Sequence, residues 1–142
     1  MNLSLLSVCF AAIAFCSCGK SGNPKPQEVL PEGVTKTYTG LKSKVLRPGQ
    51  GGKTPNSLST VKVYYKGWTK DGKVFDSSYD RGTPAEFPLD GVIPGWTEGV
   101  QLMTKGEKRR FWIPAKLAYG NNPSGGRPAG DLTFDIELID FQ

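Results

Sequence analysis

The residues with the greatest capacity for chemistry lie close together in the sequence, between positions 61 and 96. This stretch combines aromatic rings with one candidate ion pair: Tyr65, Phe75, Asp76, Arg81 and Trp96. Asp76 admits two interpretations, a turn residue at a strand end or a buried carboxylate held by Tyr65 and Arg81. The apolar pair Val92 and Ile93, just before Trp96, favours burial.

The composition excludes several other kinds of chemistry. The chain has 142 residues and no histidine, which excludes Ser/His and Cys/His catalysis and most zinc sites. The sequence contains neither the G-x-S-x-G motif of hydrolases nor the G-x-x-x-x-G-K-[ST] motif of phosphate-binding loops. We therefore expect a site that works without a metal, a cofactor or a strong general base.

Short strands and a single helix are predicted to position these side chains. Val61, Val63 and Tyr65 alternate with polar residues, as in a strand with one buried face, and Asp71-Gly72 is a hairpin signal before a returning strand at Val74. Further strands are predicted over 40–46, 108–113 and 132–138, and a helix over 94–103. The expected fold class is α+β, with an antiparallel sheet of about five strands wrapped on one short helix.

Aromatic side chains are more numerous on the predicted inward positions than a small domain needs. The inward set is Tyr65, Phe75, Trp96, Tyr119 and Phe134. Two interpretations remain open, an ordinary hydrophobic core or the lining of a pocket.

Several motifs occur in one order and resemble a known family. They are V-x-Y-x-G-W-x-x-D-G-x-V-F-D-S-S-x-D-R-G-x-P from Val63, V-I-P-G-W-x-E-G from Val92, A-Y-G from Ala118 and L-x-F-D-I-E-L from Leu132. Together they resemble the bacterial form of the FK506-binding-protein (FKBP) type of peptidyl-prolyl cis-trans isomerase. The resemblance covers residues 37–142 in one register.

The resemblance implies a proline-containing polypeptide as substrate and assigns roles to individual residues. It implies catalytic roles for Tyr65, Asp76 and Tyr119, and a substrate-binding wall formed by Phe75, Arg81, Val92, Ile93, Trp96 and Phe134. The Ile93 N–H and the Tyr119 hydroxyl would bind carbonyls of the peptide, and macrolide inhibitors such as FK506 are candidate ligands. The alternative is a chaperone module that captures proline segments with little turnover.

Two positions depart from the family pattern. Ala85 stands where many eukaryotic members have an aromatic residue, and this is expected to open one wall of the pocket. The flap over residues 121–130 lacks the bulky isoleucine pair often found there. We expect these differences to affect macrolide affinity and the preference for the residue before proline.

The N-terminal region is predicted to be a targeting segment. Residues 1–18 are typical of a signal peptide, with an apolar run from Leu3 to Ser17 that is too short for a permanent span. The stretch from Phe15 to Gly19 loosely resembles a lipobox, with Cys18 as the lipidated residue, although residues 1–5 lack a cation. Three outcomes stay open: lipidation, cleavage to a soluble periplasmic or secreted form, and an uncleaved anchor. Residues 19–36 are predicted to be a flexible tether, and 37–142 the isomerase domain.

The charge pattern gives little sign of an additional partner. The formal net charge is +5, and the densest basic run is Lys105 with the segment 108–110. A phosphate-binding patch and a solvated strand edge kept from aggregating by charge are both compatible with this run. The second interpretation is favoured because the run lacks interleaved aromatic residues, so no nucleic-acid partner is expected. We expect a monomer in the cell envelope, in contact with a membrane only through an N-terminal lipid.

Overall fold

The computed structural model describes residues 28–142; the predicted signal segment, Cys18 and the tether up to residue 27 lie outside the described residues. Seven strands form the sheet: β1 Val34–Lys36, β2 Lys42–Arg47, β3 Thr60–Thr69, β4 Val74–Ser77, β5 Ala85–Pro88, β6 Lys108–Ile113 and β7 Leu132–Phe141. The helical elements are α1 Ser78–Arg81, α2 Pro94–Val100 and the 3₁₀ turns η1 Leu89–Gly91 and η2 Ala115–Leu117.

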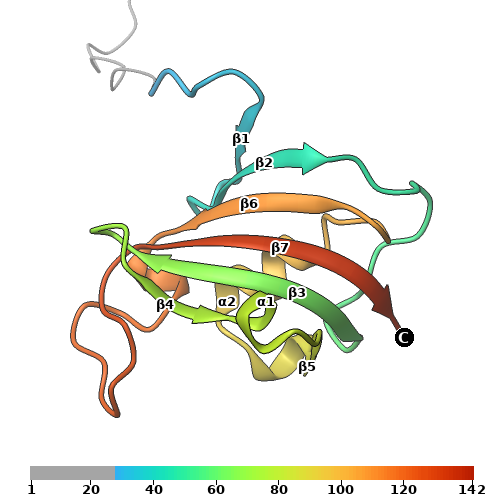
Figure 1. Cartoon of the computed structure of the whole chain (residues 1–142). Helices are drawn as coiled ribbons and strands as arrows, with labels where there is room; N and C mark the ends of the chain where they lie inside the picture. The colour runs from blue at the N-terminus through green and yellow to red at the C-terminus, as the bar shows by residue number, and fades with distance from the viewer. Residues whose placement is uncertain (1–27) are drawn as a thin grey trace, which may run out of the picture.

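All the strand pairings are antiparallel. The strand order is β1-β2-β6-β7-β3-β4, and β5 pairs with β3 beyond the stretch that β4 occupies. Four strands lie side by side in Figure 1, with α2 behind them. β3 and β7 are the longest strands, at 10 residues each, and they pair along nearly their whole length. The side chains that they turn towards α2 therefore form the middle of the core.

The core lies between one face of the sheet and α2. Alternate residues of β3 and β7 are fully buried because successive strand side chains point to opposite faces. The buried apolar set is Leu41, Val61, Val63, Tyr65, Leu89, Trp96, Val100, Met103, Phe111, Ile113, Leu132, Phe134, Ile136 and Leu138. Close packing of α2 depends on two glycines: a Cβ added at Gly95 would lie 2.4 Å from Ile113, and one at Gly99 would lie 2.6 Å from Phe111.

The predicted fold class is confirmed, with two additional strands. The sheet has seven strands rather than about five because β1 and β5 are short and lie next to turn residues, so neither produces a clear alternation. The predicted tether over residues 19–36 is too long at its C-terminal end, because Val34–Lys36 form β1, pair with β2 and belong to the sheet. The helix is shorter than expected: it ends at Val100, and i to i+3 bonds from Leu102 and Met103 form the turns that follow.

The basic run was expected at a strand edge, and this expectation is wrong. Residues 108–110 belong to β6, which is flanked by β2 and β7 in the interior of the sheet. The strand's own alternation is the same at an edge and in the middle of a sheet, so the sequence pattern could not place it. In the part of the chain from residue 28 onward, no helix is long and apolar enough to cross a membrane.

Candidate active site

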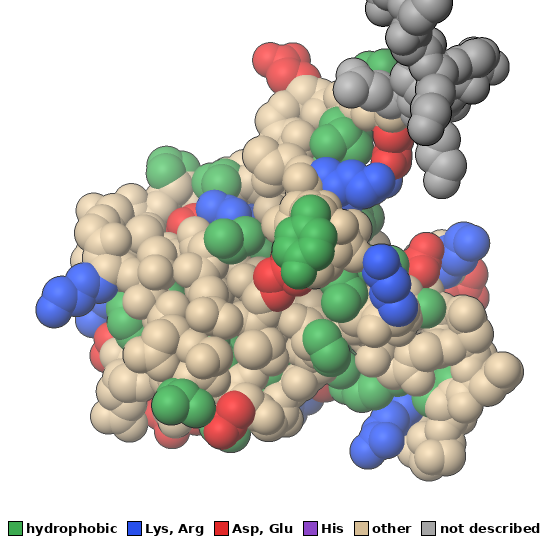
Figure 2. All heavy atoms as spheres, turned by 180° about the vertical axis from the view of Figure 1, so that it is seen from behind, with side chains coloured by type: hydrophobic (Ala, Val, Ile, Leu, Met, Phe, Trp, Pro, Cys, Tyr) green, Lys and Arg blue, Asp and Glu red, His purple; other side chains and the backbone are tan. Residues whose placement is uncertain are grey.

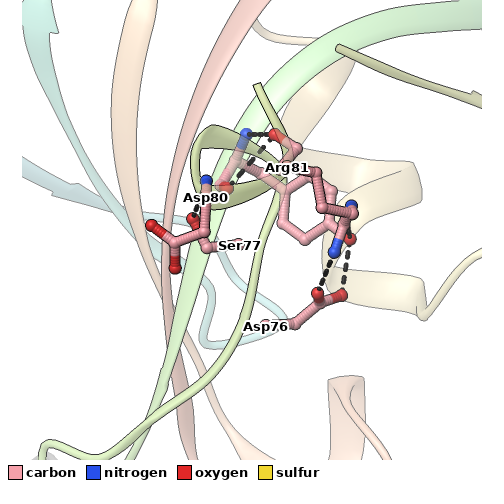
Figure 3. Close-up of polar contacts among 6 residues, drawn as sticks. Asp76, Ser77, Asp80 and Arg81 are labelled. Carbon is pink, nitrogen blue, oxygen red and sulfur yellow. Dashed lines mark hydrogen bonds and ion pairs between the residues drawn. The ribbon is translucent and has the colours of Figure 1, made fainter. Parts of the chain in front are cut away.

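A single helical turn brings Arg81 back onto Asp76. The Ser77 side chain caps α1 by accepting a hydrogen bond from the Asp80 N–H at 3.4 Å, and Gly82 ends it with a left-handed φ of 74°. Because the chain reverses within these residues, the Arg81 guanidinium donates to the Asp76 carboxylate at 2.7 Å, as Figure 3 shows. Asp76, at the end of β4, is thereby fixed by the residues that immediately follow it.

Tyr65 completes this polar group from the neighbouring strand β3. Its hydroxyl donates to the other oxygen of Asp76 at 2.5 Å and accepts a hydrogen bond from Arg81 at 2.9 Å. The guanidinium also lies 5.6 Å from the centre of the Tyr65 ring. Tyr65 and Arg81 thus hold Asp76, as predicted. The predicted burial of the carboxylate is wrong, because 40% of the Asp76 side chain and 50% of the Arg81 side chain are exposed.

These contacts move two pKa values away from neutrality. Burial raises the pKa of Asp76, but the hydrogen bonds from Tyr65 and Arg81 outweigh it and lower the pKa below its ordinary value. Burial, and then the hydrogen bond to Asp76, raise the pKa of Tyr65. The carboxylate therefore stays ionised and the phenol stays protonated near neutral pH.

The aromatic residues form a cluster around Trp96, which is only 5% exposed. Three rings meet the indole nearly at right angles: Tyr65 and Phe134 with centroids at 5.3 Å, and Phe87 at 5.6 Å. Phe75 packs edge-on against Phe134 at 5.5 Å. Gly67 of β3 makes this last contact feasible, since a Cβ there would lie 2.7 Å from both phenylalanine rings. Trp96 Nε1 is buried and has no hydrogen-bond partner among residues 28–142.

The segment before α2 supplies the adjoining wall. Pro94 begins the helix, so Ile93 is its N-cap and Trp96 lies in its first turn. The Thr97 hydroxyl donates to the Leu89 carbonyl at 2.6 Å and holds η1 against the helix. The Ile93 N–H makes no backbone hydrogen bond within the described chain, so this donor is available to a ligand.

A cavity of about 480 Å³ joins these groups. Its lining comes from β3, β4, β5, η1, α2, β7 and the loop after η2: Tyr65, Phe75, Asp76, Phe87, Gly91, Val92, Ile93, Trp96, Tyr119, Arg127 and Phe134. The apolar rings can hold a small apolar group, and Asp76 can orient a polar one beside it. Such a site combines shape selection with electrostatic orientation.

Most of the predicted site residues come together here, with a few differences. Eight of them line the cavity, and the ninth, Arg81, is bonded to two lining residues. Tyr119, which was expected to point inward, lines the cavity but is 38% exposed because it lies in a loop at the edge of the cavity. Ala85, where a small side chain was expected to open one wall, pairs with Val63 in β5, packs against the core and lies outside the cavity lining.

Sequence reasoning missed Phe87, Gly91 and Arg127 in the lining. The apolar alternation of Ala85 and Phe87 around Glu86 was the available signal for β5. Arg127 lies in a glycine-rich loop that offers no pattern, and its guanidinium lies 5.7 Å from the centre of the Tyr119 ring.

Comparisons with known proteins point to one family. A family sequence model described as FKBP-type peptidyl-prolyl cis-trans isomerase matches residues 51–139. The chain is 54% identical over 109 residues to the FKBP-type peptidyl-prolyl cis-trans isomerase FkpA of Aeromonas hydrophila, covering 76% of this chain and 40% of that protein. It is 49% identical over 112 residues to FkpA of Escherichia coli K12, covering 78% of this chain and 41% of the relative. The chain thus spans about two fifths of the length of these relatives.

Solved structures agree with this similarity. The crystal structure of FkpA from Escherichia coli matches with a TM-score of 0.74 and 48% identity, over 79% of this chain and 53% of that one. A peptidyl-prolyl cis-trans isomerase from Pseudomonas syringae matches with a TM-score of 0.71 and 40% identity, over 79% and 83% of the two chains.

Proposed function

Because the chain belongs to the FKBP-type peptidyl-prolyl cis-trans isomerase family, we propose that it accelerates the cis-trans isomerisation of X-Pro bonds in polypeptides. The observation that carries the proposal is the cavity of about 480 Å³ lined by Trp96 and its perpendicular rings, with the Asp76 carboxylate fixed at its edge. The prolyl ring is a small apolar group of the kind that this lining accommodates.

The chemistry needs no proton transfer. Rotation about the X-Pro bond is slow because it breaks amide resonance, at a cost of about 18–20 kcal/mol. In the twisted amide the carbonyl and the nitrogen are less delocalised and depend less on water, so an apolar pocket stabilises the twisted form relative to the planar one. This agrees with a site in which the Asp76 carboxylate stays ionised and the Tyr65 phenol stays protonated.

Each polar group has a proposed role in holding the peptide. The prolyl ring lies over Trp96, and Asp76 faces the substrate carbonyl, held in place by Tyr65 and Arg81. The Ile93 N–H and the Tyr119 hydroxyl donate to carbonyls of the chain on either side of the proline. Both donors are without an acceptor in the described structure, which supports these roles.

The direct test is the rate of cis-trans isomerisation of a short X-Pro peptide in the presence of the purified chain. We expect a rate well above the uncatalysed one, inhibited by excess of a second proline peptide. A folded protein that binds the peptide without raising the rate would instead favour the alternative, a chaperone module that captures proline segments with little turnover. Competition by FK506 would place the macrolide in the same cavity.

We further propose that the chain acts in the cell envelope as a monomer, and that Cys18 carries a lipid. The apolar segment before Cys18 and the polar residues after it support this proposal. The mass of the mature N-terminus tests it: a diacylated or triacylated Cys18 is expected, and an unmodified terminus beyond Cys18 would contradict lipidation.

A further inference from the structure

The face of the sheet that points away from α2 carries an ordered pattern of cations and aromatic rings. Strand register places Lys42, Trp112, Thr133 and Trp68 in one row across four strands. The next row is Lys44, Arg110, Asp135 and Lys66, and the third is Arg47, Lys108, Glu137 and Tyr64. Side chains that are two residues apart along a strand point to the same face. The three rows therefore form one continuous surface.

This surface, which we call the outer face, has an excess of positive charge. The outward strand positions hold eight cations, Lys36, Lys42, Lys44, Arg47, Lys62, Lys66, Lys108 and Arg110, against four carboxylates, Glu86, Asp135, Glu137 and Asp140. Figure 2, which views the molecule from behind the sheet of Figure 1, shows both signs interspersed on the opposite side. The outer face is therefore the part of the chain that would attract an anionic partner.

Aromatic rings on the outer face are already covered by cations. Lys66 and Arg110 each lie 5.7 Å from the centre of the Trp68 ring. Tyr64 stacks on Tyr79 at 5.2 Å, and Lys108 lies 5.4 Å from the Tyr79 ring. Cation–π packing of this kind orders the cations and leaves few ring faces for stacking nucleic-acid bases.

The outer face is hollowed next to its first row. A groove of about 840 Å³ lies there, with apolar side chains including Val34, Leu46 and Trp112 and cationic ones including Lys44, Lys70 and Arg110. Lys44 and Lys70 make no ion pair among the described residues. The one carboxylate in the lining, Asp131, accepts a hydrogen bond from the Ala115 N–H at 2.9 Å. The groove thus offers two uncompensated cations beside an apolar floor.

We propose that this groove is a second binding site, for an acidic, extended polypeptide segment with apolar residues between its carboxylates. Carboxylates would pair with Lys44 and Lys70, while apolar side chains contact Leu46 and Trp112. A concave groove accommodates a single chain better than a flat lipid surface. The adjoining segment 19–27 of this chain carries two lysines and no acid, so a separate polypeptide is the better match. The site lies on the opposite face of the sheet from the aromatic cavity and does not depend on turnover there.

The experiment measures binding of a labelled, proline-free peptide of about twelve residues in which Glu alternates with Leu and Phe. The full chain is expected to bind it, and binding is expected to weaken when salt is raised from about 50 to 300 mM. Lys44→Glu with Lys70→Glu is expected to weaken binding at least about tenfold. The matched control, Lys53→Glu with Lys73→Glu, changes the net charge equally at exposed positions outside the groove, and is expected to weaken binding less than about threefold.

Both double variants are expected to isomerise a short X-Pro peptide at the wild-type rate, which would show that they are folded. If the wild-type chain is inactive, circular dichroism provides the folding control. Equal binding by the wild type and the Lys44/Lys70 variant, or equal binding of a peptide with Gln in place of Glu, would overturn the proposal. It would also be overturned if phosphatidylglycerol vesicles or oligothymidylate bound in a groove-dependent way while the acidic peptide did not.

Discussion

The two sides of the aromatic cavity are built in different ways. One side, which we call the packed wall, consists of Tyr65, Phe75, Trp96 and Phe134, whose rings contact one another and the core. The other side, the flap side, consists of Tyr119 and Arg127, which are both exposed and lie in a loop. The packed wall therefore has its shape determined by folding, whereas the flap side can change with little effect on stability. This difference predicts which substitutions abolish the site and which only tune it.

The largest effect is expected from removing the centre of the packed wall. Trp96→Ala deletes a buried indole that three rings contact, and substitutions of this kind cost about 3–5 kcal/mol. We expect a large fall in melting temperature together with loss of isomerisation, measured by calorimetry and peptide assay. Tyr119→Ala is the matched change on the flap side and should leave the melting temperature nearly unchanged. Equal destabilisation by both changes would remove the distinction between the two sides.

A smaller effect is expected at the polar edge of the packed wall. Asp76→Leu keeps much of the side-chain volume but removes the acceptor for Tyr65 and Arg81. Because no proton transfer is involved, we expect kcat/KM to fall by about one to two powers of ten without vanishing. Stability should change little, since half of the Arg81 side chain is exposed and water replaces the lost partner. Complete inactivity of the folded variant would indicate acid–base chemistry instead.

Acid pH should reproduce part of that effect in the wild type. The pKa of Asp76 is lowered in the folded chain, so its contribution to stability is present above the ordinary aspartate pKa and is lost as pH falls through the lowered value. Turnover should therefore be flat between about pH 6 and 8 and decline only in strongly acidic buffer. A pH series at constant ionic strength measures this. A steep ionisation near neutrality would contradict the mechanism.

On the flap side, removal of one hydroxyl should have a modest effect. Tyr119→Phe retains the ring beside Arg127 and deletes only the proposed donor to a peptide carbonyl. Loss of one solvent-exposed hydrogen bond predicts a reduction of about two- to tenfold in kcat/KM, with unchanged stability. Steady-state rates with one X-Pro peptide, together with thermal unfolding, provide the measurement. An effect as large as that of Asp76→Leu would show that this exposed hydroxyl matters as much for turnover as the Asp76 carboxylate, contrary to the distinction between the two sides.

The smallest effect should be a change of substrate preference at Arg127. This cation lines the cavity and has no ion pair within residues 28–142, so it should favour an acidic residue next to the proline. Arg127→Gln is expected to reduce the ratio of rates for Glu-Pro over Gln-Pro peptides by about two- to fivefold at low salt. Lys116→Gln, outside the cavity lining, is the control. An unchanged ratio would show that the loop does not influence selectivity.

The same contrast explains what the sequence could predict. Tyr65 and Phe134 were placed correctly because each lies in a long strand with regular alternation, and Trp96 because Pro94 marks the start of its helix. Tyr119 lines the cavity, but its exposure could not be predicted because its loop has no period. The basic residues of β6 were taken for an edge because strand order depends on pairings with distant segments.

The pairing of β3 with β7 has a consequence for how the domain folds. Thr69 pairs with Leu132 and Val61 with Phe141, so residues far apart in the chain must meet before the middle of the sheet exists. Domains dominated by such long-range contacts fold on a timescale of about milliseconds to seconds. Until β7 arrives, Tyr65 and Trp96 lack Phe134 as a neighbour. The cavity is therefore completed late, and a partly folded chain exposes the same aromatic surface that the finished domain offers to its ligand.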